Sequence, residues 1–168
     1  GGIAGLPDAC KALGIARPLL VPDPGLARLP MIESAVAACR AAGLACDVYS
    51  DVQANPIEAN VSNGVHVYRE GGHDGVVAFG GGSALDTGKA IALMIGQTRP
   101  IWDFEDREDW YTRVNAAGIA PIVGIATATG TGSEVGRASV ITDVRDRTKK
   151  IIFHPKMQPA LVIADPEL

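Results

Sequence analysis

Residues 75–89 decide the fold; they read GVVAFGGGSALDTGK. The first five are continuously apolar, a pattern typical of a strand that is covered on both faces of its sheet. Gly80, Gly81, Gly82 and Ser83 follow, and a helix is predicted from about Ala84 to residue 95. A glycine-rich turn between a strand and a helix presents free N–H groups at the positive end of the helix dipole, where phosphates bind. This stretch therefore predicts a strand, a phosphate-binding loop and a helix, with Ser83 as the N-cap.

The glycine loop matches neither of two common phosphate-binding motifs. A Walker loop would need glycine at Ser83 and serine or threonine at Ala90. A Rossmann G-x-G-x-x-G pattern that starts on Gly80 and Gly82 would need a third glycine at Leu85. Only the context of the loop favours phosphate binding, and a purely structural turn remains the alternative.

Strand-length and helix-length segments alternate along the rest of the chain. Strands are predicted at 18–21, 46–49, 121–126, 140–142, 151–153 and 161–164, and helices at 28–42 and 55–71. The order indicates an α/β fold, a Rossmann-like parallel sheet with helices on both faces. Residues 100–118 are polar, contain both tryptophans and are predicted to be a long surface excursion that is partly helical.

A second loop, Thr127 to Glu134 (TATGTGSE), follows the predicted strand 121–126 and offers hydroxyls from Thr127, Thr129, Thr131 and Ser133. Open α/β sheets bind ligands at the carboxyl ends of their strands. We therefore expect the two loops to share one nucleotide site. A plain Gly/Thr turn is the alternative for the second loop.

Composition and charge argue against several other classes of protein. A chain of 168 residues, 47% apolar and 20% charged, fits one folded domain over 1–168. The formal charge of -4 offers no basic surface for nucleic acid. No apolar run approaches 18 residues, no signal segment is present, and three cysteines are widely spaced. These features predict a cytoplasmic protein with reduced thiols and no membrane or nucleic-acid partner.

Taken in order, several motifs resemble those of the iron-containing (group III) alcohol dehydrogenase family. They are VPD (21–23), NP (55–56), GGGSALD (80–86), GTGSE (130–134), VITD (140–143), and HPKM followed by ADPEL from residue 154 onward. The resemblance covers essentially the whole chain, and it is the ordered set that makes it specific. It implies that the chain is the N-terminal dinucleotide-binding domain of a longer enzyme, without the family's all-helical C-terminal domain, which carries one Asp and three His metal ligands.

The resemblance assigns cofactor-binding positions at the two ends of the site. Asp23 would face the adenosine ribose and favour NAD over NADP, with a simple turn aspartate as the alternative. Asn55 would line the cofactor groove, or simply begin a helix. Val140 would lie near the nicotinamide, and Lys149, with Lys150 as its competitor, would reach the nicotinamide ribose.

Between these ends, the resemblance places the pyrophosphate and the residues around it. The implied cofactor-binding residues there are Gly80, Gly81, Gly82, Ser83, Asp86, Thr127 and Thr131. Asp86 either stabilises the helix N-terminus or orients the loop, and Lys89 pairs with Asp86 or with a phosphate. The family usually reads PTTAGTGSE where this chain reads ATATGTGSE, and we expect the loop to be retained despite this departure.

The resemblance also implies an activity for the full-length enzyme. Hydride would pass between NAD(H) and an alcohol or aldehyde, with Fe²⁺ or Zn²⁺ as the Lewis acid. His66, His73 and His154 show no ligand spacing, so we expect no metal ligand and no catalytic residue in these 168 residues. The fragment alone is expected to be inactive, and the full enzyme a homodimer or larger. The alternatives are glycerol dehydrogenase, maleylacetate reductase, a dehydroquinate-synthase-like enzyme, or a non-catalytic nucleotide-binding module.

Overall fold

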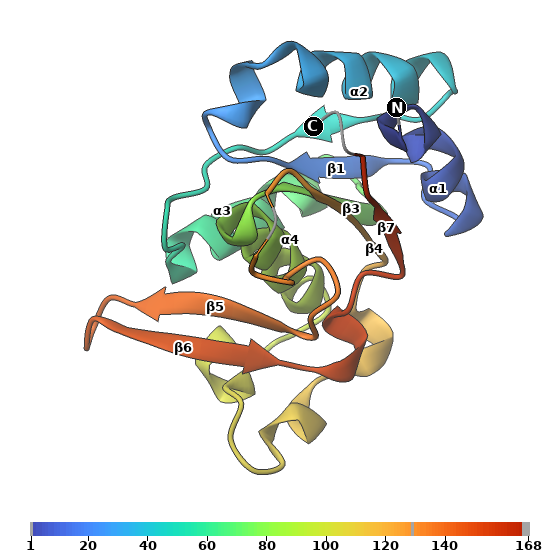
Figure 1. Cartoon of the computed structure of the whole chain (residues 1–168). Helices are drawn as coiled ribbons and strands as arrows, with labels where there is room; N and C mark the ends of the chain where they lie inside the picture. Colours follow the sequence, from blue (N-terminus) through green and yellow to red (C-terminus); the bar gives the residue numbers. More distant parts are fainter. Residues whose placement is uncertain (1, 129, 166–168) are drawn as a thin grey trace.

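A computed structural model describes residues 2–128 and 130–165 (Figure 1). Within them, a five-stranded sheet has the order β2-β1-β3-β4-β7. Its strands are β1 (Pro18–Val21), β2 (Asp47–Val48), β3 (Gly75–Gly80), β4 (Ile122–Ala126) and β7 (Leu161–Ile163). Every pairing in this sheet is parallel, as predicted. The motif ADPEL lies partly outside the described residues, since 166–168 are not among them.

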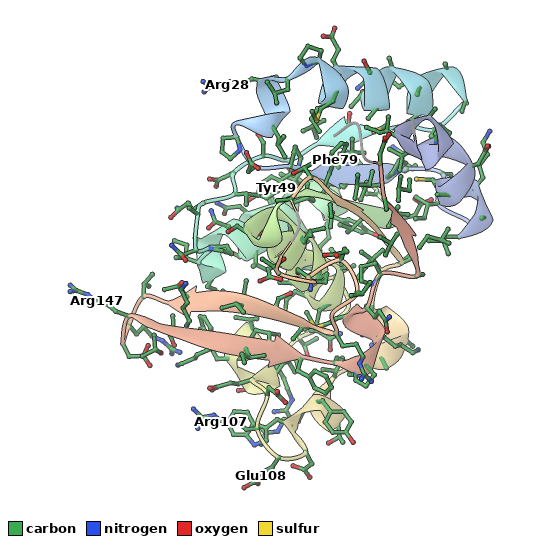
Figure 2. All side chains as sticks on the ribbon, viewed as in Figure 1. Arg28, Tyr49, Phe79, Arg107, Glu108 and Arg147 are labelled. Carbon is green, nitrogen blue, oxygen red and sulfur yellow. The ribbon has the colours of Figure 1, made fainter. Side chains whose placement is uncertain are left out.

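Helices cover both faces of the sheet (Figure 1). Helices α1 (Leu6–Ala12) and α2 (Pro30–Ala41) contribute to one apolar cluster, and α3 (Glu58–Glu70) and α4 (Gly82–Met94) to the other. On β3, Val77 and Phe79 belong to the first cluster, whereas Val76 and Ala78 belong to the second, as the pleat of a strand requires. Phe79 lies inside the molecule (Figure 2). The Rossmann-like architecture is thereby confirmed.

The cysteines and the lengths of the helices can be read directly from the described ranges. Cys10, Cys39 and Cys46 are free and buried, and all three belong to the apolar cluster under α1 and α2. None of the helices in residues 2–128 and 130–165 has both the length and the apolar character needed to cross a bilayer.

The strands predicted at 140–142 and 151–153 exist, but they lie outside the main sheet. They are parts of β5 (Ala138–Asp143) and β6 (Thr148–Phe153), which form a separate antiparallel hairpin. Only residues 144–147 connect them, and a parallel pairing would need a crossover of a dozen or more residues. Arg147, with φ 58, stands in the connecting turn and projects from the tip of the hairpin (Figure 2).

Residues 100–118 are more than the surface excursion that we expected. They contain three 3₁₀ helices, η3 (Ile101–Phe104), η4 (Trp110–Arg113) and η5 (Ala116–Gly118). Ile101 and Phe104 are buried in the core. The Asp106 N–H donates to the Ile151 carbonyl over 2.7 Å, so the segment also continues the hairpin at its β6 edge. The partly helical character was expected, but the surface position was wrong for Ile101, Phe104 and Val114, which belong to the buried core. Polar residues dominate the composition of the segment and conceal these three apolar residues.

Candidate functional site

The two glycine-rich loops leave the sheet next to each other. Gly80 ends β3, Ala126 ends β4, and the two residues are paired in register. The Thr127 N–H donates to the Gly80 carbonyl over 3.2 Å. Gly80 has φ 145, and a Cβ there would lie 2.9 Å from the Ala84 Cβ, so glycine is required at the point where the chain turns into α4. The predicted meeting of the two loops is therefore what the structure has.

The first loop ends in the N-terminus of α4, which begins two residues earlier than predicted. The N-cap is Gly81, with φ -76 and ψ -177, and Ser83 lies in the first helical turn rather than at the cap. A Cβ on Gly81 would have no atom of the described residues within 4 Å, apart from its two chain neighbours. First-turn N–H groups have no acceptor within their own helix, so this end of α4 offers donors to an anion.

Two cavities adjoin at this helix terminus, since both are lined by Gly82 and Ser83. The larger cavity encloses about 960 Å³ of empty space, open solvent included, and extends toward the hairpin; its other lining residues include Asn55, Asp86, Lys89, Thr131, Val140, Thr142, Lys149 and Ile151. The smaller cavity, about 730 Å³ on the same measure, extends toward β1 and is lined by Asp23 and Gly81 among others. Most of the predicted residues are thus brought together. Gly80 and Thr127 line neither cavity; they are hydrogen-bonded to each other where the two loops leave β3 and β4. Thr129 lies outside the described residues.

Asp23 has a structural role through one of its carboxylate oxygens. Its Oδ1 accepts from the N–H groups of Gly25 and Leu26, both over 2.9 Å. Its Oδ2 lies on the side of Gly80, 3.5 Å from where a Cβ would stand. The turn role, which was the alternative for Asp23, is therefore present through Oδ1. Contact between the Asp23 carboxylate and a ribose stays a prediction.

Asn55 is not the helix entry that was the alternative to a binding role. Helix α3 starts at Glu58, and its N-cap is Ile57. Asn55 has φ 60, a left-handed conformation that asparagine tolerates better than most residues. It therefore lies in the turn before the helix, at the wall of the larger cavity.

Asp86 and Lys89, one helical turn apart on α4, hold the second loop and β5. Asp86 Oδ1 accepts from the Ser133 hydroxyl over 2.6 Å, and Oδ2 accepts from the Val140 N–H over 3.0 Å. Lys89 is fully buried; its Nζ donates to the carbonyls of Ser133 (2.9 Å) and Ala138 and lies 3.3 Å from Asp86 Oδ1. Burial lowers the pKa of Lys89, and the nearby Asp86 carboxylate opposes this shift. The sequence left Asp86 and a phosphate as possible partners of Lys89, and in the structure Lys89 pairs with Asp86.

The hairpin distinguishes between the two neighbouring lysines. Lys150 Nζ lies 2.6 Å from an oxygen of Asp143 and 3.1 Å from Asp146. Arg145, with Lys150, holds the pKa of the Asp143 carboxyl well below its usual range. Neighbouring residues of a strand face opposite sides, so Lys149 instead lines the larger cavity. The sequence alone could not separate these two lysines.

Some residues of the site were missed by sequence reasoning. Thr142 pairs with Lys149 and Ile151 pairs with Val140 across the hairpin, and all four line the larger cavity. The two missed residues lie two positions from Val140 and Lys149, so strand alternation could have found them. Ser133 was noted for its hydroxyl, but its role as a partner of Asp86 depends on contacts across the fold.

The three histidines have separate structural surroundings. His66 pairs with the exposed Glu70 over 3.3 Å, His73 Nδ1 lies 3.0 Å from the Arg17 carbonyl, and His154 accepts from the Lys156 N–H. Across residues 2–128 and 130–165, no group of three or more His, Cys, Asp and Glu side chains is arranged to hold a metal ion. The described residues therefore do not fit the iron or zinc centre that the resemblance implies for the full-length enzyme.

Relatives were found among curated proteins. The chain is 36% identical to 4-hydroxybutyrate dehydrogenase of Cupriavidus necator and 32% identical to NAD-dependent methanol dehydrogenase of Bacillus methanolicus, each match covering 100% of this chain and 43% of the relative. The chain thus spans less than half the length of the curated relatives that it matches.

Solved structures also match nearly the whole of this chain and less than half of their own length. The fold matches 1,3-propanediol oxidoreductase with a TM-score of 0.90 at 32% identity, over 98% of this chain and 42% of that one. It matches sulfoacetaldehyde reductase from Bifidobacterium kashiwanohense, solved in complex with NAD⁺, with a TM-score of 0.88 at 27% identity, over 99% of this chain and 43% of that one. The model of one family, described as iron-containing alcohol dehydrogenase, matches residues 1–166. As its ordered motifs predicted, the chain belongs to the iron-containing alcohol dehydrogenase family.

Proposed function

We propose that the chain binds NAD(H) along the two adjoining cavities and serves as the cofactor-binding part of an oxidoreductase that acts on alcohols or aldehydes. The observation that carries this proposal is the meeting of two glycine-rich loops at the N-terminus of α4, with open space at the Gly81 Cα. A pyrophosphate needs close approach to backbone N–H groups, and a side chain at this position would prevent it. The NAD⁺ complex of one structural relative supports the same choice of cofactor.

The chain's own residues suggest an orientation for the dinucleotide. First-turn N–H groups of α4 would take the pyrophosphate, and Asp23 in the smaller cavity would take the adenosine ribose. The nicotinamide half would then lie in the larger cavity, where Val140 and Ile151 form an apolar wall beside the Lys149 ammonium. Such a wall keeps water from one face of the ring. When bound, NAD(H) supplies the hydride chemistry, and the protein supplies binding and orientation.

On this proposal the residues described here are not sufficient for turnover. The described residues offer no group of side chains that could hold iron or zinc, so on this proposal the metal ligands belong to the rest of the longer enzyme. The alcohol or aldehyde substrate, and a homodimeric or larger assembly, belong to the proposal for the longer enzyme. Two of the relatives are named as dehydrogenases of different alcohols, 4-hydroxybutyrate and methanol.

Titration with NADH tests the proposal directly. We expect a saturable change in NADH fluorescence, with weak affinity, because the cleft is formed from one side only. Adding unlabelled NAD⁺ should reverse the change. Absence of saturable binding up to millimolar NADH would be evidence against a dinucleotide site in this chain.

The choice between NADH and NADPH should depend on Asp23. Asp23→Asn keeps an oxygen that can accept from Gly25 and Leu26 but removes the charge that would repel a 2′-phosphate. We expect the ratio of NADPH to NADH dissociation constants to fall about tenfold, equivalent to about 1.4 kcal/mol. Asp23→Gly, which also loses the turn bonds, separates the effect of charge from that of loop geometry. An unchanged ratio in Asp23→Asn would show that the carboxylate does not face the ribose.

A further inference from the structure

Lys89 is a buried cation that the proposed function leaves without a role. It is 0% exposed, although it lies on the helix whose N-terminus forms the phosphate end of the site. An ammonium group has three N–H donors and no acceptor. Here each donor has a protein oxygen within reach, from Ser133, Ala138 and Asp86. Lys89 therefore has no donor left for a phosphate, and its role must be sought in what it holds.

What it holds is the segment between the second loop and β5. Ser133 lies in the second loop and Ala138 is the first residue of β5. The Lys89 ammonium donates to the carbonyls of both and so bridges the loop and the strand. Asp86 adds bonds to the Ser133 hydroxyl and to the Val140 N–H. Two residues of α4 thus fix residues 133–140 from one side, through partners 44 to 54 positions away in the chain.

This attachment brings the second loop against the first. A Cβ on Gly82 would lie 3.1 Å from Thr131 Cγ2, so the two loops are in contact at the cavity wall. Thr131, two residues before the attached segment, and Val140, at its end, both line the larger cavity. If residues 133–140 moved away from α4, both would move with them, and one wall of the cavity would be lost.

We propose that Lys89 is a positioning residue for dinucleotide binding: its buried ammonium holds residues 133–140 against α4, so that both glycine loops face one cleft. The proposal rests on the proposed function for the ligand, but the attachment itself can be measured without any ligand. Lys89 lies in the wall of the larger cavity but is 0% exposed and its donors are taken by protein oxygens, so it acts through the segment that it holds.

The test compares variants of the full 168-residue chain, with NADH as the probe. Lys89→Met keeps the length of the side chain but removes its donors, and Lys89→Arg keeps a buried cation. Gln97→Met is the matched control, because Gln97 is also buried and bonds to the backbone at Leu93 and Asn115, away from both cavities. Hydrogen exchange is followed at the Val135 and Gly136 amides, which bond within the second loop, and at Val77 in the sheet.

We expect Lys89→Met to raise the NADH dissociation constant about tenfold or more and to speed exchange at Val135 and Gly136, while Val77 exchanges as in the wild type. Lys89→Arg should restore both properties at least in part. Gln97→Met should lower stability without changing NADH affinity by more than about twofold. The proposal would be overturned by either of two results. One is a Lys89→Met chain that binds NADH as tightly as the wild type; the other is a Gln97→Met chain that loses as much NADH affinity as Lys89→Met.

Two further outcomes keep the test decisive. If Lys89→Met does not fold, the free wild-type chain is used: protected Val135 and Gly136 amides support the attachment, and exchange at the rate of an unstructured peptide overturns it. If the wild-type chain does not bind NADH, the proposed function fails. The exchange data then show separately whether Lys89 holds the loop.

Discussion

Replacing Gly81 by valine is expected to weaken NADH binding at least about tenfold while leaving the fold intact. The backbone at Gly81 is extended, with φ -76 and ψ -177, which valine adopts readily. Apart from the two chain neighbours, no atom of residues 2–128 and 130–165 lies within 4 Å of the new Cβ, so the side chain enters the space assigned to the pyrophosphate rather than the core. The free energy of unfolding should change by less than about 1 kcal/mol. NADH fluorescence titration and urea unfolding of the same preparation measure the two effects.

Gly5→Val is the control for this experiment. Gly5 also has an ordinary conformation, with φ -80, and open space around its Cβ position, but it precedes α1 and lines neither cavity. We expect it to bind NADH like the wild type. Equal affinity in wild type and Gly81→Val would mean that the dinucleotide does not pass over Gly81, and the proposed orientation would have to be given up.

Replacing Gly88 by valine should have the opposite effect, a large loss of stability. Gly88 lies where α4 crosses β3; a Cβ would come 2.6 Å from the Ala78 Cβ and 3.1 Å from its Cα. The backbone of a central strand cannot give way as a flexible side chain can, so helix and sheet would have to separate. We expect a loss of about 3 kcal/mol, only slightly offset by the better helix propensity of valine.

Urea unfolding measures this loss as a lower midpoint at an unchanged slope. Gly5→Val again serves as the control, with a change of less than about 1 kcal/mol. A Gly88→Val chain as stable as the wild type would show that α4 does not pack on β3 as closely as described. Together, Gly81 and Gly88 separate two uses of glycine in one motif, an open approach for a ligand and a close crossing of helix and strand.

The unit from β3 through the glycine loop to α4 could be predicted from sequence because its pattern is local. Five apolar residues in a row predict a strand buried on both faces, and β3 is buried throughout. The glycines that follow predict the turn into a helix, which Gly80 makes with φ 145. The start of α4 was two residues off, since Gly81 rather than Ser83 is the N-cap. Caps depend on backbone conformation that composition determines only loosely.

The second half of the site was less accessible to sequence reasoning. The strand pattern at 140–142 and 151–153 was correct, but it could not tell whether these strands join the main sheet or pair with each other. The short connection over 144–147 was the available signal for a hairpin. The buried anchors Ile101 and Phe104 were hidden by the polar residues around them.

The sequence by itself determined the parallel sheet and the two glycine loops, because hydrophobic period and glycine placement act over a few neighbouring residues. The family resemblance came from the ordered set of motifs along the chain. Only the tertiary structure decided that Lys149 rather than Lys150 lines the cavity, and that Asp86 and Lys89 bind protein groups. The physical reason is range. A buried charge takes whichever oxygens the fold brings to it, and for Lys89 these lie 44 and 49 residues away, where no local pattern can indicate them.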